Sequence, residues 1–254
     1  MKPKLAVLAV GSFLVLASCD AFFSTNLFKE AGLGQVKLPS ASELASMSTD
    51  ELLSEADSPE FYVQLEADSD KLAAVLANLN NQVVSSSDPA TVQEAAFLSA
   101  QIQLKTTDAF EAVNGIFDAF ATVDLAAVDE TNIDDLLRAA LPAGVLEDRS
   151  RFDAAIAALL AADAAYTALG TSIGPDGVYE GDIPVGDLGT AAQGALVAAA
   201  LAGVTANPNL ATALWAAIDA GDSSGLSGFA SPSTSLGTSL GNLLGAAGIT
   251  FTFN

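Results

Sequence analysis

The chain contains no histidine and a single cysteine, Cys19, among its 254 residues. Without histidine, neither a Ser–His–Asp triad nor a zinc site with imidazole ligands can form. A lone cysteine closes no disulfide within the chain and cannot build a thiolate zinc site. The catalytic chemistry that remains open to this composition depends chiefly on carboxylates. We therefore expect a non-catalytic protein, with no catalytic residue and no metal site.

Basic residues are also scarce: nine Lys and Arg stand against 31 Asp and Glu, a formal net charge of −22. Nucleic acids and anionic lipid headgroups bind proteins through clusters of Lys and Arg. The charge therefore argues against nucleic acid or an anionic bilayer as a direct partner of the folded body. The excess of acidic residues could attract cations or a basic protein partner. A solvated acidic surface without any such partner would give the same composition. Both interpretations stay open.

The first residues have the pattern of an export signal. Lys2 and Lys4 precede an almost wholly apolar run from Leu5 to Ala17. This run is too short to span a bilayer core, which requires about 20 residues, but it suits the apolar region of a secretory signal. An ordinary signal peptide, with Cys19 a coincidence, is one interpretation.

The sequence LASC at residues 16–19 resembles the lipobox of bacterial lipoproteins, with which it shares the spacing of charge, apolar run, small residues and cysteine. The resemblance implies that the Cys19 thiol takes up a diacylglyceryl group as a thioether, and that cleavage falls between Ser18 and Cys19. It also implies N-acylation of the new amine. A thiol suits the reaction because it is the best nucleophile among side chains near neutral pH. No cofactor is expected beyond this covalent lipid.

The same resemblance divides the chain into a signal peptide (1–18), a lipidated tether (19–39) and an α-helical domain (40–254). Removing 1–18 takes away two lysines and no acid, so the formal charge becomes −24. The lipid would anchor the protein in the cell membrane or the outer membrane, with its body facing the periplasm or the cell exterior. Asp20 resembles the inner-membrane retention signal of many Gram-negative lipoproteins. That rule fails in some lineages, spirochaetes among them, so the choice of membrane stays open.

Helix-start signals recur from residue 40 onward. Ser40 with Glu43, and Ser48 with Glu51, have the capping-box spacing, in which a hydroxyl and a carboxylate bind exposed backbone N–H groups. Apolar residues at helical spacing predict a series of helices, with residues 194–204 buried at the centre. The helices are expected near 72–83, 110–120, 133–141, 152–169, 188–204 and 209–220, with further starts at Ser58-Pro59, Asp88-Pro89, Asp108, Thr131 and Asn207-Pro208.

These signals predict an all-α fold, either an array of helical hairpins or an irregular helical bundle. The first option rests on the spacing of Ser58-Pro59 and Asp88-Pro89, near the period of tetratricopeptide-like repeats, although the consensus aromatic and glycine positions are not filled. A short β-hairpin around Asp176-Gly177, within 174–187, is a further option, and residues 248–254 alternate like a short strand. Residues 220–241, rich in Ser and Gly, are expected to form a loop.

Asp163 is the candidate for ligand contact. A carboxylate in the middle of an apolar helix face must be hydrogen-bonded, paired or protonated, because an isolated buried charge is costly. The alternatives to a ligand are an arginine partner or a face less buried than its pattern suggests. The face consists of Ile156, Leu159, Leu160, Tyr166 and Thr167, and the possible arginine partners are Arg138, Arg149 and Arg151.

Other conspicuous residues favour structural roles. The stripe of Phe110, Val113, Phe117 and Phe120 is expected to be core rather than the wall of a pocket, and so is Trp215. The loop acids Asp176, Glu180 and Asp182 lack the alternating pattern of an EF-hand, so an exposed acidic turn is favoured over a calcium site.

The leading functional hypothesis is a membrane-anchored lipoprotein whose helical body holds a protein partner on the extracytoplasmic side. The alternative is a ligand-binding accessory lipoprotein of a transport system. Helical lipoproteins of spirochaetes that work with tripartite uptake systems are similar to this chain in outline: a lipobox, an acidic linker region and tetratricopeptide-like helices. A carboxylate-dependent hydrolase is the third class, and it has no recognisable signature here.

Overall fold

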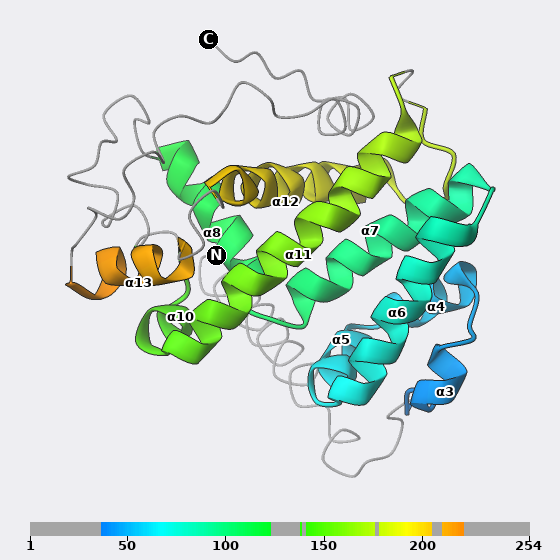
Figure 1. Ribbon diagram of the computed structural model, residues 1–254, viewed down its shortest axis with the longest axis horizontal. Helices are drawn as coiled ribbons and strands as arrows, with labels where there is room; N and C mark the ends of the chain where they lie inside the picture. The colour runs from blue at the N-terminus through cyan, green and yellow to red at the C-terminus, as the bar shows by residue number, and fades with distance from the viewer. Residues whose placement is uncertain (1–36, 123–137, 139–140, 176–177, 205–209, 221–254) are drawn as a thin grey trace, which may run out of the picture. The chain divides into compact units, whose positions relative to one another are not determined.

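The structure is a computed structural model that describes residues 37–122, 138, 141–175, 178–204 and 210–220 (Figure 1). The chain divides into two units, Met1–Leu38 and Pro39–Asn254. The helices belong to the second unit, and of the first only Lys37 and Leu38 are described. Throughout the described residues the regular structure is helical and contains no strand, which confirms the predicted all-α class.

From α3 to α8 the helices follow one another with short connections, as the start signals predict. Their bounds are α3 (Ala41–Leu44), α4 (Thr49–Ala56), α5 (Pro59–Glu66), α6 (Ser69–Ser85), α7 (Pro89–Lys105), α8 (Ala109–Thr122), α10 (Ala143–Glu147), α11 (Arg149–Ile173), α12 (Val185–Val204) and α13 (Leu210–Ala220).

Both predicted capping boxes are present. The Glu43 carboxylate accepts from the Ser40 backbone N–H at 2.7 Å, and the Ser40 hydroxyl accepts from the Glu43 N–H. Ser48 and Glu51 repeat this arrangement at the start of α4. These bonds hold the pKa of Glu43 and of Glu51 below the usual value, because each carboxylate accepts hydrogen bonds from its capping serine.

Two other predicted starts differ in detail. Ser58 precedes Pro59 as expected, but its hydroxyl donates to the Glu60 carboxylate at 2.7 Å and caps no backbone N–H. Asp108 precedes α8, yet its carboxylate binds the Arg151 guanidinium at 2.8 Å, and the Thr107 hydroxyl accepts from the first N–H of the helix instead. A tertiary ion pair here takes the place of a local cap.

Helix α11 is longer than its pattern predicts. The predicted end was Gly170, but the helix continues through this residue to Ile173. Gly170 is buried, and the helix stops only at Gly174, whose φ of 67° lies in the left-handed region that favours glycine. A glycine inside a buried helix face allows close packing and need not end the helix.

The central element of the bundle is α7. Every side chain from Gln93 to Ile102 is buried, because α6 and α4 pack on one side of α7 and α11 packs on another (Figure 1). Residues 194–204, predicted to lie at the centre of the fold, form the second half of α12, which packs on α11. This helix begins at Val185, three residues before the predicted start at Leu188. Since the most extensive helix contact joins α7 to α11, which are not neighbours in the chain, the irregular bundle describes the fold better than a hairpin array.

Several predictions lie wholly or partly outside the described residues. The described part of 174–187 contains no β-hairpin: it is a turn, an irregular stretch with a bend at 181–182, and the start of α12. Asp176 and Gly177, around which the hairpin was predicted, are not described. Also outside lie the signal peptide with Ser18 and Cys19, most of 133–141, Asn207-Pro208, the loop 220–241 beyond Ala220, and the strand 248–254.

Among the described helices, α11 alone is long and apolar enough to cross a membrane by length and composition. One face of α11 is nevertheless part of the hydrophobic core, with Phe152, Leu159, Tyr166 and Leu169 almost fully buried. A buried core helix of a bundle passes the same test of length and hydropathy.

Candidate functional site

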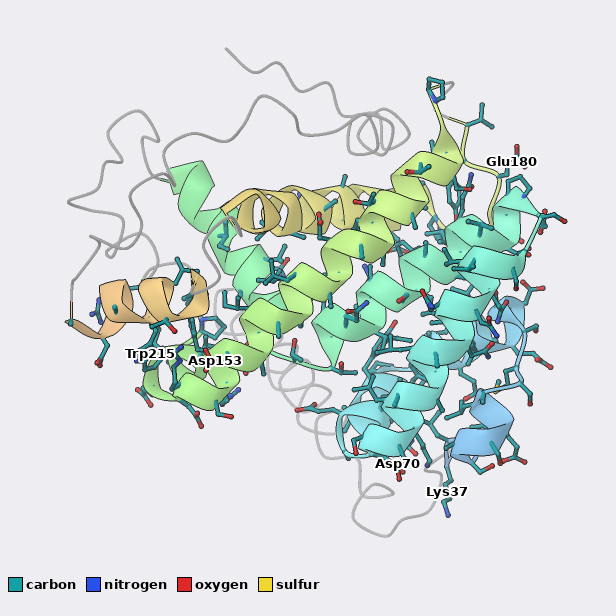
Figure 2. All side chains as sticks on the ribbon, viewed as in Figure 1. Lys37, Asp70, Asp153, Glu180 and Trp215 are labelled. Atoms are coloured by element: carbon teal, nitrogen blue, oxygen red, sulfur yellow. The ribbon has the colours of Figure 1, made fainter. Side chains whose placement is uncertain are left out.

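The described residues offer a polar region at the N-terminal end of α7. Two consecutive buried side chains, Gln93 and Glu94, hold the segment 178–184 against the helix. The Gln93 side-chain oxygen accepts from the Glu180 backbone N–H, and a Glu94 carboxylate oxygen accepts from the Asp182 N–H, each at 2.8 Å. Figure 2 shows Glu180 at this end of α7. Glu180 and Asp182 therefore lie in a segment fixed through its backbone, and Asp176 lies outside the described residues.

Glu94 is the least usual group in this region. It is 6% exposed, and burial raises the pKa of its carboxyl group, an effect that the hydrogen bond from the Asp182 N–H partly offsets. The negative charges of Asp50, Asp182 and Asp88 raise the pKa further. Glu94 thus takes up a proton more readily than an ordinary glutamate.

Tyr179 covers the same carboxylate. Its ring packs against the core, its hydroxyl oxygen is buried, and a side chain at Gly181 would collide with both the Tyr179 hydroxyl and Glu94. Burial raises the pKa of Tyr179 well above its usual value. The nearby Ile183 N–H lowers the pKa of Tyr179 in part, although it does not meet the geometry of a hydrogen bond to the hydroxyl. Position 181 therefore requires glycine, because Tyr179 and Glu94 lie too close to leave room for a side chain.

A second polar contact joins α6 to the turn between α3 and α4. The Asn78 side-chain amide donates to the carbonyl oxygens of Leu44 and Met47, each at 2.8 Å. Gln82, one turn later, donates to the Met47 carbonyl and to the Asn78 side chain, and accepts from the buried Thr49 hydroxyl. These bonds satisfy carbonyls that the end of a short helix leaves free, so we assign them a structural role.

Asp163 is half-buried on α11, and burial raises the pKa of its carboxyl group. The face around it is less buried than its pattern suggests, since Thr167 is exposed and Leu160 only partly buried. The buried face of α11 is instead centred on Leu159, Ala162 and Tyr166, and Asp163 lies at its edge. Its role in ligand contact stays a prediction.

The arginines proposed as partners of Asp163 bind other carboxylates or lie exposed. Arg149 pairs with Asp153 at 2.8 Å one turn along α11, and Arg151 pairs with Asp108. Arg138 is exposed. The α11 arginines thus stabilise the start of their own helix and its contact with α8.

The aromatic residues have the packing roles predicted for them, where they are described. Trp215 contacts the Phe152 ring edge-on, with centroids 5.3 Å apart, and the Arg149 guanidinium lies 5.4 Å from the Trp215 ring. Val113 is buried and Phe110 packs against the core. The side chains of Phe117 and Phe120 lie outside the described part.

Lys105, in the last turn of α7, was not singled out by the sequence. Its ammonium group lies 4.7 Å from the Tyr62 ring centroid and 5.6 Å from that of Phe110, although the residue as a whole is exposed. Partial burial lowers the pKa of Lys105, and the charge of Asp187 opposes this. Burial raises the pKa of Tyr62 to about 12. Cation–π contacts here join α5, α7 and α8.

The sequence also gave no reason to single out the Tyr166 hydroxyl. Tyr166 is 3% exposed, and its hydroxyl is buried with no hydrogen-bond partner. It lies over Gly194 of α12, where an added Cβ would meet the hydroxyl oxygen at 2.6 Å. The apposition of α11 and α12 cannot be read from either segment alone.

No group of three or more Asp, Glu, Cys or His residues that could hold a metal ion occurs among the residues that the structure describes. Comparison with known proteins adds no relative: no family model matches the chain, and no curated protein or solved structure is significantly similar to it. Functional inference therefore depends on the residues themselves.

Proposed function

We propose that the chain is a bacterial lipoprotein, anchored through acyl groups on Cys19, whose helical body acts as a non-catalytic protein-interaction module on the extracytoplasmic side. The observation that carries the proposal is the sequence LASC at 16–19, placed after Lys2, Lys4 and the apolar run 5–17. No other cysteine competes for modification.

The strength of the membrane attachment follows from the free energy of burying the acyl chains. Each buried methylene contributes about 0.8 kcal/mol, and a single acyl chain gives only marginal, reversible binding. The thioether-linked diacylglyceryl group and the N-acyl chain together supply the two or three chains that lasting attachment requires. The protein then stays in the cell membrane or the outer membrane without any membrane-spanning helix of its own.

The charge of the body supports a role in holding a partner rather than in binding lipid. The acidic excess repels anionic headgroups, so the acyl chains would hold the body near a membrane that its surface does not bind. Three of the described cations are already paired with carboxylates: Lys71 with Asp68, Arg149 with Asp153, and Arg151 with Asp108. A basic protein surface is the partner that such a body favours.

The alternative function, a ligand-binding accessory lipoprotein of a transport system, has one supporting observation. Asp163 is half-buried with a raised pKa and lies at the edge of the α11 core face. A carboxyl group in that position suits contact with a bound polar molecule.

Intact-mass analysis of protein purified from its native host tests the anchor. The expected product begins at Cys19 and carries the added mass of a diacylglyceryl group and one further acyl chain. Cys19→Ser should accumulate as an uncleaved precursor without added acyl mass, whereas the control Ser18→Ala keeps a small residue before the cysteine and should mature normally. Maturation of Cys19→Ser with detergent partitioning like that of the parent chain would refute the proposal.

Two measurements test the role of the body. A chain that begins at Asp20, and so lacks both the lipid and the apolar signal segment, should not sediment with vesicles rich in phosphatidylglycerol, even at low salt, and sedimentation would contradict the charge argument. For a partner, a photo-crosslinking residue replaces Val63, which is 63% exposed on acidic α5. We expect one discrete protein adduct in native membranes, reduced by high salt. The absence of any adduct there and at the exposed Val84 of α6 would count against an interaction module.

A further inference from the structure

The seam between α11 and α12 contains one polar group with nothing to bind. The Tyr166 hydroxyl is buried without a partner, and a Cβ added at Gly194 of α12 would meet both this hydroxyl and the Leu104 side chain of α7. Tyr166, Leu104 and the α12 residues on either side of Gly194, Ala191 and Ala195 among them, belong to the hydrophobic core.

Both members of the Tyr166–Gly194 pair lower the stability of the fold. A phenylalanine at 166 would fill the core without leaving a buried hydroxyl unsatisfied, which is destabilising. An alanine at 194 would favour the helix, but the Tyr166 hydroxyl occupies the space that its Cβ needs. Two matched, destabilising choices at one point are typical of a functional site, where stability gives way to chemistry.

The surroundings decide what the hydroxyl can bind. A buried water needs two to four polar partners, whereas the atoms nearest a Cβ added at Gly194 belong to Tyr166 and Leu104, and the Tyr166 hydroxyl is the one polar group among them. An apolar environment with one hydrogen-bonding group is instead the usual composition of a small-molecule site. The fitting molecule is apolar and carries a single oxygen that accepts a hydrogen bond.

Helix α12 has the features of a helix that can shift to admit such a molecule. Gly186 and Gly189, in its first two turns, have nothing within 4 Å of the position of an added Cβ, so packing requires neither glycine. Each lowers helix stability relative to alanine. The half of α12 that leads to Gly194 is therefore weakly held as a helix.

We propose that the α11–α12 seam at Tyr166 and Gly194 is a binding site for a small apolar molecule with one hydrogen-bond-accepting oxygen, to which the Tyr166 hydroxyl donates. The site does not depend on the lipid anchor or on a protein partner, so its test is independent of the proposed function.

The test uses the full-length chain and two probes of similar shape, cyclohexanone and methylcyclohexane, which lacks the oxygen. Dissociation constants come from saturation-transfer NMR, with circular dichroism at 222 nm to confirm folding. We expect saturable binding of cyclohexanone, about fivefold tighter than that of methylcyclohexane. Fivefold corresponds to one neutral hydrogen bond of about 1 kcal/mol.

Three variants locate the site. Tyr166→Phe removes only an unpaired hydroxyl, so it should fold normally and weaken cyclohexanone binding about fivefold while leaving methylcyclohexane unaffected. Gly194→Ala should weaken both probes, because its Cβ adds bulk at the point where α12 already contacts the Tyr166 hydroxyl. Tyr179→Phe, the control, removes the other buried tyrosine hydroxyl, away from the seam, and should bind as the parent chain does. No saturable binding of cyclohexanone, or equal binding by Tyr166→Phe and the parent, overturns the proposal.

Discussion

The apposition of Tyr166 and Gly194 makes a sharp prediction about two glycines of the same helix. Gly194→Ala and Gly189→Ala are identical chemical changes inside α12, and each gains the same helix preference of about 1 kcal/mol. At Gly189 the added Cβ meets nothing within 4 Å. At Gly194 it meets the Tyr166 hydroxyl at 2.6 Å and the Tyr166 Cζ at 3.1 Å.

The magnitude follows from the packing. Tyr166 is 3% exposed and cannot turn away into solvent. Overpacking a core costs about 1–3 kcal/mol. Gly189→Ala should therefore raise the free energy of unfolding by about 0.5–1 kcal/mol, whereas Gly194→Ala should leave it unchanged or lower it by up to about 2 kcal/mol. Because the helix-preference term cancels, the difference between the two variants, about 1–3 kcal/mol, measures the steric contact alone.

The assay is urea unfolding followed by circular dichroism at 222 nm, with the m value required to stay constant. Tyr166→Phe in the Gly194→Ala background removes the 2.6 Å contact and should recover part of the loss, a coupling of about 0.5–2 kcal/mol. If Gly194→Ala is as stable as Gly189→Ala, the two helices do not approach one another as described, and the argument for the seam fails with it.

Three further predictions concern pH, a polar contact and a fluorescent reporter. Because burial raises the pKa of Glu94, the folded state binds more protons than the unfolded state at pH values just above the ordinary glutamate pKa. The free energy of unfolding should therefore rise as the pH falls from 7 toward 5. Glu94→Gln should be more stable than the parent chain at pH 7 and should lose this advantage toward pH 4.5. Asn78→Ala removes the donor to two carbonyls and should lower the free energy of unfolding in urea by about 1–3 kcal/mol, whereas Asn80→Ala, exposed on the same helix, should change it by less than about 0.5 kcal/mol. Arg149→Ala removes the cation over Trp215, the only tryptophan, so the fluorescence emission of Trp215 should shift to longer wavelength and become more sensitive to quenching by acrylamide. Unchanged emission would show that the packing of α13 does not depend on this contact.

Local sequence signals predict features that a few neighbouring residues decide. The capping boxes at Ser40 and Ser48 and the proline-led start at Asp88 are confirmed, because a cap needs only a side chain and the next turn of backbone. The all-α class follows from the same signals and from the helical period of apolar residues. The absence of histidine likewise excludes imidazole chemistry whatever the fold.

Where a tertiary partner competes with a local one, the sequence misleads. Asp108 has the position of a cap but binds Arg151, which is 43 residues away. The face of α11 was predicted from its large side chains alone, yet the buried face is centred on Leu159, Ala162 and Tyr166 and includes alanines that the pattern left out, because contacts with several neighbouring helices decide which side is covered. Asp163 consequently moves from the centre of a buried face to its edge.

By itself, the sequence determined that the chain is helical and acidic, where several helices begin, and that its one thiol is that of Cys19. Only the tertiary structure decided that α7 is central, that Glu94 is buried behind the segment 178–184, and that the Tyr166 hydroxyl faces Gly194. The reason is that caps and helical periods are set within one or two turns, whereas burial and unpaired polar groups depend on which distant helices meet.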